Sequence, residues 1–97
     1  MKVAEYEAFV LEKAKMSVED DSYNVIGLCG EAGEVAEWVK KAIYRKNDKF
    51  TEEMLQLELG DVIHYVTRMA IKHKWTLKQI MAANIVKLTA RGEVKIG

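Results

Sequence analysis

Apolar residues recur along most of the chain at the three-to-four-residue spacing of amphipathic helices, and the breaks in this pattern predict four helices. We place them at residues 3–16, 22–45, 52–73 and 77–91. In the first of these, one stripe holds Val3, Tyr6, Val10 and Ala14. Four amphipathic helices joined by short turns, in a chain without proline, predict one all-α domain of the helical-bundle type over residues 1–97.

Residues at the predicted helix starts support these boundaries. Asp20 or Asp21 is placed to cap the second helix, and Thr51 to cap the third. Thr76 is followed three positions later by Gln79, which predicts a capping box at the start of the fourth helix.

The second and third predicted helices share an internal repeat. Residues 31–39, EAGEVAEWV, align without a gap on residues 58–66, ELGDVIHYV. On a helical wheel, each helix has one apolar arc, and its acidic residues fall at the same edge of that arc. The acidic residues at this shared edge are Glu31, Glu34, Glu58 and Asp61.

An antiparallel pairing of the two apolar arcs would line these four carboxylates along one seam. Residues three apart on a helix are surface neighbours, so each helix presents a pair. Clustered anions repel one another and therefore bind protons or cations. Oxygen-only ligands suit Mg²⁺ or Mn²⁺, and Mg²⁺ held by carboxylates usually also binds a phosphate. The repeat thus predicts a catalytic metal site for a phosphorylated substrate, whereas Glu37 falls on the outer, solvated face.

Gly33 and Gly60 occupy equivalent places between the acids of each pair. Glycine inside a helix costs roughly 1 kcal/mol relative to alanine, so two in matching places need a reason. Either a bulky ligand approaches the backbone there, or the glycines permit close helix packing. Both interpretations stay open.

Composition and charge exclude several classes of function. Fifteen basic and fifteen acidic residues cancel, which argues against broad nucleic-acid binding and against an anionic membrane as partner. The N-terminus has no signal-peptide core and no run is long enough for a membrane span, so a cytoplasmic protein is expected. The single cysteine, Cys29, excludes an intrachain disulfide and is predicted to be a buried, inert thiol. The tail at 93–97 is either frayed or an arm reaching a neighbouring subunit.

The segment GLCGEAGEVAEWVKK followed by LELGDVIHYV resembles the MazG family of all-α nucleoside triphosphate pyrophosphohydrolases, in its short single-domain form. The resemblance covers about residues 23–91. It implies hydrolysis of NTPs or dNTPs to the monophosphate and pyrophosphate, with Mg²⁺, or Mn²⁺ as a substitute, held by the ExxE and ExxD acids identified above. It also implies a homodimer or homotetramer with the nucleotide near the subunit contact.

The fourth helix carries ANIVKLTAR, which resembles the family's Asn-x-x-Lys and Arg element and implies nucleotide contacts by Asn84, Lys87 and Arg91. These residues share one face, and Asn84 falls inside the apolar arc, so a buried asparagine is expected. Without the resemblance, a core asparagine flanked by solvated cations is the simpler interpretation. Trp38 and its repeat partner Tyr65 either stack on the base or fill a subunit interface.

Three points stay open at this stage. One glutamate is expected to be the general base; the sequence does not say which, and Glu31 and Glu34 are the nearer candidates. A di-iron carboxylate bundle is a second possibility, but it would need Glu-x-x-His pairs, and only Asp61 with His64 comes close to one. If His64 is not a metal ligand, it is expected to be a surface or interface residue. A non-catalytic helical oligomer or regulatory partner that retains the acidic pattern is the remaining alternative.

Overall fold

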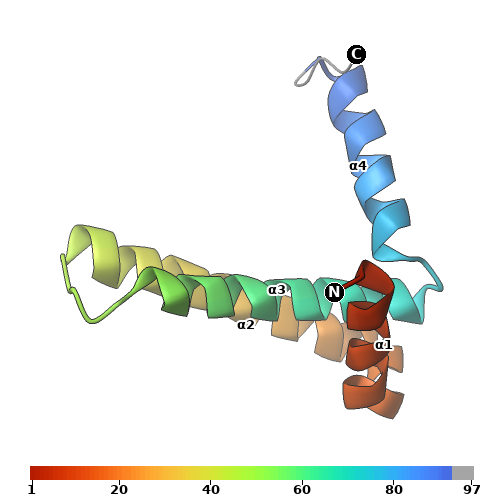
Figure 1. Ribbon diagram of the computed structural model, residues 1–97, viewed down its shortest axis with the longest axis horizontal. Coiled ribbons are helices and arrows are strands. Elements are labelled where there is room, and N and C mark those ends of the chain that lie inside the picture. Colours follow the sequence, from red (N-terminus) through yellow and green to blue (C-terminus); the bar gives the residue numbers. More distant parts are fainter. Residues whose placement is uncertain (93–97) are drawn as a thin grey trace.

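The computed structural model describes residues 1–92, in which the chain forms four α-helices and no strand (Figure 1). The all-α prediction is confirmed. Their bounds are α1 Val3–Ala14, α2 Asp21–Val39, α3 Glu52–Lys72 and α4 Leu77–Ala90. A 3₁₀ helix, η1 (Lys15–Glu19), follows α1, and a π-helical stretch, η2 (Lys40–Tyr44), continues α2. The predicted arm at 93–97 lies outside the described residues.

The helix starts have the predicted caps. The side chain of Asp20, not Asp21, accepts a hydrogen bond from the Tyr23 amide at 3.1 Å. Thr51 caps α3 through its hydroxyl. Thr76 and Gln79 form the capping box of α4, each side chain accepting from the other's backbone amide. Local side-chain chemistry therefore sets where these three helices begin.

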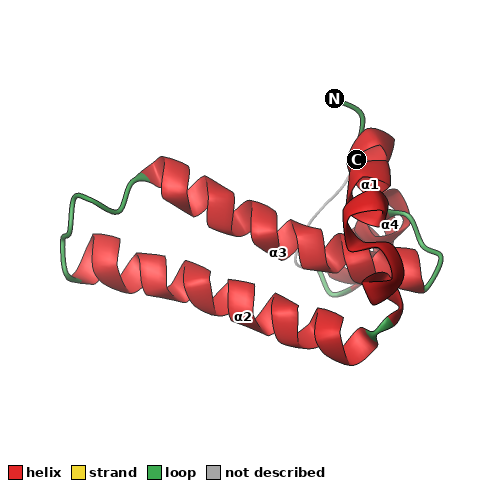
Figure 2. Cartoon of the chain, turned by 90° about the horizontal axis from the view of Figure 1, so that it is seen from below, coloured by secondary structure: helices red, strands yellow, loops and turns green. Residues whose placement is uncertain are grey.

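The helices do not close into a bundle within one chain. α2 and α3 run side by side and antiparallel, and α1 crosses them near the α3 C-terminus (Figure 2). α4 leaves the end of α3 and projects away from this pair (Figure 1). The radius of gyration is 15.8 Å, against about 12.5 Å for a compact chain of this length. The described residues of this chain thus do not form the closed bundle expected from the sequence.

The core lies where α1, η1 and the ends of α2 and α3 meet. Its buried apolar residues are Val10, Ala14, Val18 and Ala70. Along the rest of the α2–α3 pair the apolar arcs are covered only in part. Cys29 is exposed, so the prediction of a buried thiol is wrong. The reason is that its face of α2 turns away from the elements that form the core.

A buried arginine ties the core elements together. Arg68 of α3 is only 4% exposed. Its Nε donates to Asn24 Oδ1 and its Nη2 donates to Ser17 Oγ, both at 2.7 Å. Asn24 in turn donates to the Val18 carbonyl at 2.9 Å. Buried polar groups need such partners, so this network fixes η1 and the start of α2 against α3.

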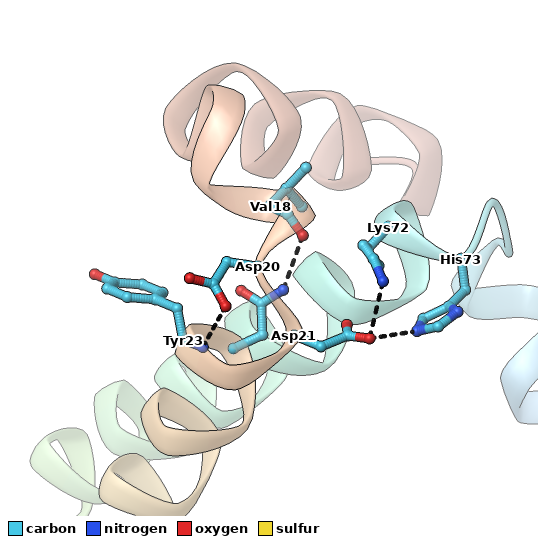
Figure 3. A network of polar contacts seen from close by, with 7 residues as sticks. Val18, Asp20, Asp21, Tyr23, Lys72 and His73 are labelled. Carbon is cyan, nitrogen blue, oxygen red and sulfur yellow. Dashed lines mark hydrogen bonds and ion pairs between the residues drawn. The ribbon is translucent and has the colours of Figure 1, made fainter.

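A second polar contact joins the start of α2 to the end of α3. The Asp21 Oδ2 atom lies 3.0 Å from Lys72 Nζ and 3.2 Å from His73 Nε2 (Figure 3). The His73 ring stacks on Trp75 with the ring centroids 5.0 Å apart. The side chains involved are part-exposed, so we expect a modest contribution to stability.

This contact predicts an acid-sensitive share of the stability. The hydrogen bond from Lys72 is the main cause that lowers the pKa of Asp21 below its ordinary value of 3.8. A carboxylate with a lowered pKa stabilises the fold above its unfolded-state pKa, and this is lost as the pH falls through the folded-state pKa. We expect the difference in unfolding free energy between wild type and Asp21→Asn to be present at pH 6 and to shrink below about pH 3.8. Urea titrations at pH 6 and below about pH 3.8 measure this difference in unfolding free energy, with the exposed Asp48→Asn as control. A difference that does not change with pH would contradict the role given to Asp21.

Candidate metal centre

Three of the four predicted acids meet between α2 and α3. One carboxylate oxygen from each of Glu31, Glu58 and Asp61 lies within 4.8 Å of those of the other two. Glu31 comes from α2, and Glu58 and Asp61 lie one turn apart on α3. We call these residues the acidic trio. The antiparallel pairing and the three-residue spacing on α3 place both of its acids opposite Glu31.

Glu34 lies one helical turn beyond Glu31, is exposed, and is not part of the acidic trio. In an antiparallel pair, that next turn runs toward the start of α3 and so away from Asp61. Glu34 is nevertheless close enough for its charge to raise the pKa of Glu31. The expected seam of four carboxylates is therefore a cluster of three with a fourth at its rim.

Burial and the clustering of the acids raise the pKa of Glu31. Burial is the largest cause that raises the pKa of Glu31, followed by the negative charges of Asp61, Glu58 and Glu34. Clustered carboxylates that repel one another are stabilised by a divalent cation. Three oxygen donors from acidic side chains fit Mg²⁺ or Mn²⁺, and leave coordination positions for water and phosphate. The residues present thus fit the metal that the sequence implies.

The two helix glycines beside the acids face open space. A Cβ atom built on Gly33 or on Gly60 would meet no atom within 4 Å. Close packing of helices within this chain therefore does not explain them. The other interpretation, that a bulky ligand approaches the backbone here, stays a prediction.

A hollow of about 380 Å³ adjoins the acidic trio on the side of α1. Its lining includes, from α1, Tyr6, Phe9 and Lys13, and, from α3, Gly60, Asp61 and His64. Burial and then the charge of Asp61 raise the pKa of Tyr6. No sequence pattern predicted Tyr6 at this place, because contacts between α1 and α3 leave no local pattern.

His64 belongs to this hollow and not to the acidic trio. Burial is the main cause that lowers its pKa, followed by the charge of Arg68. Among the described residues, the cluster of possible metal ligands therefore consists of three carboxylates and includes no histidine. A di-iron centre of the Glu-x-x-His kind therefore lacks its nitrogen ligands.

The predicted substrate-binding residues stand apart from the acidic trio within one chain. Asn84, Lys87 and Arg91 are exposed and belong to α4 and its C-terminal cap, which project away from the α2–α3 pair (Figure 1). The expectation that Asn84 is buried is wrong: Leu77 at the start of α4 is half-buried, whereas Asn84 lies farther along the helix, where no element of the described chain covers it. Trp38 is half-buried, and its indole Nε1 donates to the Thr51 carbonyl at 2.8 Å. This bond ties the end of α2 to the start of α3.

Comparison with known proteins identifies the family of this chain. A model of the MazG nucleotide pyrophosphohydrolase domain matches residues 21–94, which include the acidic trio, Glu34 and α4. The chain belongs to the MazG family. A MazG-family assignment confirms the resemblance carried by the ExxE and ExxD motifs.

The chain is also similar to the Gene 37 protein of Mycobacterium phage L5. The two are 42% identical over 78 residues, which cover 77% of this chain and 68% of the phage protein. The name of that protein specifies no activity. No solved structure matches the chain. Within residues 1–92, none of the helices has the length and apolar character needed to cross a bilayer.

Proposed function

We propose that this MazG-family chain is a Mg²⁺-dependent nucleoside triphosphate pyrophosphohydrolase that converts NTPs or dNTPs to the monophosphate and pyrophosphate. The observation that carries the proposal is the convergence of Glu31, Glu58 and Asp61 to within 4.8 Å inside a MazG domain. Acids distributed for solubility alone would be spread over the surface, since like charges held together cost free energy.

The chain's own residues have distinct roles in this proposal. The acidic trio holds Mg²⁺ through carboxylate oxygens. When bound, Mg²⁺ supplies neutralisation of phosphate charge and acidifies a water molecule for attack on phosphorus. In this proposal Glu34, which is exposed and near enough to act on Glu31, accepts the proton from that water. We therefore assign the general base to Glu34, because in this proposal Glu31 is a metal ligand.

The nucleoside half of the substrate fits the hollow beside the trio. Its volume of about 380 Å³ lies within the range of small-molecule sites, about 300–1,000 Å³. The Tyr6 and Phe9 rings lie 6.4 Å apart and offer an aromatic surface for a base. Asp61 belongs to both the hollow and the trio, so a nucleotide can reach from one to the other.

We further propose that the protein is a homodimer or homotetramer whose contact includes α4. Three apolar side chains of α4, Met81, Ile85 and Val86, are 50%, 53% and 68% exposed. The accessible surface of the chain is 7518 Å², about a third above the roughly 5,700 Å² of a compact monomer of this mass. Burial of such a surface would drive association. Assembly would place Lys87 and Arg91 where cations can stabilise phosphate oxygens.

The assembly has a direct test. We expect light scattering to give a mass two or four times the 11.1 kDa of the chain, because the exposed apolar face of α4 is removed from water in the oligomer. The Ile85→Lys variant should shift the mass toward the monomer, whereas Lys78→Ala, outside the apolar arc, should not. A wild-type mass of 11.1 kDa at micromolar concentration would contradict the assembly.

The reaction is tested by a pyrophosphate-release screen over ribo- and deoxynucleoside triphosphates. We expect Mg²⁺-dependent formation of monophosphate and pyrophosphate in equal amounts, abolished by a chelator. Glu34→Gln should fold normally and lose about 10²-fold or more of the turnover. The matched control is Glu37→Gln, on the outer face and paired with Lys41 at 3.2 Å. Release of orthophosphate instead, or inactivity on every nucleotide, would contradict the proposal; inactivity would favour a non-catalytic oligomer.

A further inference from the structure

We propose that Gly27 and Tyr65 form a notch that sets the spacing of α2 and α3 and thereby positions the acidic trio. Tyr65 is then a positioning residue of the metal centre. The catalytic consequence rests on the proposed function, whereas the consequence for cation binding does not.

The ring of Tyr65 occupies the space that a side chain at position 27 would need. A Cβ atom built on Gly27 would overlap the Tyr65 ring, with Cδ1 at 2.6 Å and two further ring atoms closer. Real Cβ atoms essentially never approach another heavy atom within 3.0 Å. Gly30 and Gly33, on the same helix, have no atom within 4 Å of such a Cβ. Among these three glycines, only Gly27 is needed for packing within the chain.

The notch lies beside the trio on both helices. Gly27 precedes Glu31 by four residues, and Tyr65 follows Asp61 by four, so each is one helical turn from its acid on the same face. α2 and α3 run antiparallel (Figure 2), and the approach of the Tyr65 ring to Gly27 puts these two turns at the same level. A change of helix spacing at the notch is therefore transmitted to the distance between Glu31 and Asp61.

The ring of Tyr65 cannot leave the notch without breaking other contacts. The Arg68 guanidinium lies 5.4 Å from the Tyr65 ring centroid and 5.0 Å from that of Tyr23. The two tyrosine rings are 6.4 Å apart. Arg68 is itself buried and hydrogen-bonded to Asn24 and Ser17. The core network therefore fixes the ring, and the ring fixes the helix spacing.

The first test compares two alanine substitutions on α2. Gly27→Ala should weaken Mn²⁺ binding, measured by electron paramagnetic resonance on protein shown to be folded by circular dichroism, by roughly tenfold or more. Gly30→Ala should bind Mn²⁺ as wild type does, since its Cβ meets open space. Equal Mn²⁺ affinity in Gly27→Ala and wild type, or a wild type that binds no Mn²⁺, would overturn the proposal.

A double-mutant cycle separates positioning from general stability. If the overlap with the ring is the cause, Gly27→Ala should cost Mn²⁺ affinity only where Tyr65 is present and little in a Tyr65→Ala background. If Gly27→Ala alone does not fold, the Tyr65→Ala background still gives a result, because it removes the ring that the new Cβ atom would overlap. An equal loss in both backgrounds would overturn the proposal.

The two proposals fail in different ways. If the wild type binds Mn²⁺ but releases no pyrophosphate from any nucleotide, the proposed reaction is refuted, and the double-mutant cycle on Mn²⁺ affinity still tests the notch. A wild type that is active, with Gly27→Ala unchanged in Mn²⁺ affinity and kcat, refutes the notch. If both proposals hold, Gly27→Ala lowers kcat more than it raises KM, because misplaced acids affect the reacting phosphate more than the nucleoside.

Discussion

Glu58→Gln is expected to reduce pyrophosphate release by about 10²-fold or more while making the metal-free protein more resistant to urea. Both effects have one cause. The charge of Glu58 is among those that raise the pKa of Glu31, so in the absence of a cation it destabilises the fold. In the proposed site, the Glu58 carboxylate would be a ligand of Mg²⁺ when nucleotide and metal are bound. Sites that carry unfavourable charge for function commonly show this opposition of activity and stability.

The matched control for this variant is Glu53→Gln. Glu53 is exposed in the first turn of α3, outside the acidic trio, where a negative charge interacts favourably with the helix N-terminus. Its substitution should leave pyrophosphate release unchanged and slightly lower the resistance to urea, opposite in both respects to Glu58→Gln. A Glu58→Gln variant that is active, or that is destabilised without metal, would contradict our account of the trio.

Arg68→Met should cause a large loss of stability, about 2–4 kcal/mol in the free energy of unfolding at fixed protein concentration. The substitution removes the donors to Asn24 Oδ1 and Ser17 Oγ and the cation between two tyrosine rings. A buried acceptor left without a donor costs about 1–3 kcal/mol. Urea unfolding followed by circular dichroism measures the loss.

Lys72→Met provides the comparison one turn along α3. Lys72 is part-exposed and pairs with Asp21 at the surface, so its loss should cost less than about 1 kcal/mol. If the two variants were equally stable, the polar network around Arg68 would not be the feature that holds η1 and α2 to α3.

Local chemistry made much of this fold predictable. The helix starts follow from Asp20, Thr51 and Thr76, whose side chains bond to amides three residues away. The pairing of Glu58 with Asp61 follows from helical spacing, and the 27-residue repeat indicates where Glu31 belongs. These features depend on neighbours in sequence, and the sequence therefore displays them.

Features that depend on distant parts of the chain were not predictable. Arg68 meets Asn24 across 44 positions and Ser17 across 51. The role of Gly27 depends on a ring in another helix, so in the sequence it resembles the other glycines of α2. Asn84 and Cys29 were predicted to be buried because their neighbours are apolar. Among the described residues, the helix faces that carry Asn84 and Cys29 are uncovered. A helical wheel cannot distinguish an apolar face that is buried within its own chain from one that a second chain would cover.

The central claim is that the acidic trio binds the divalent cation that serves the triphosphate. The most direct measurement is the anomalous scattering of Mn²⁺ in crystals grown with a non-hydrolysable nucleoside triphosphate. Our account predicts an anomalous peak at coordination distance, about 2.0–2.3 Å, from carboxylate oxygens of Glu31, Glu58 and Asp61, with a phosphate oxygen on its open side. A Mn²⁺ peak elsewhere on the protein, or nucleotide bound with no Mn²⁺ at the trio, would contradict it.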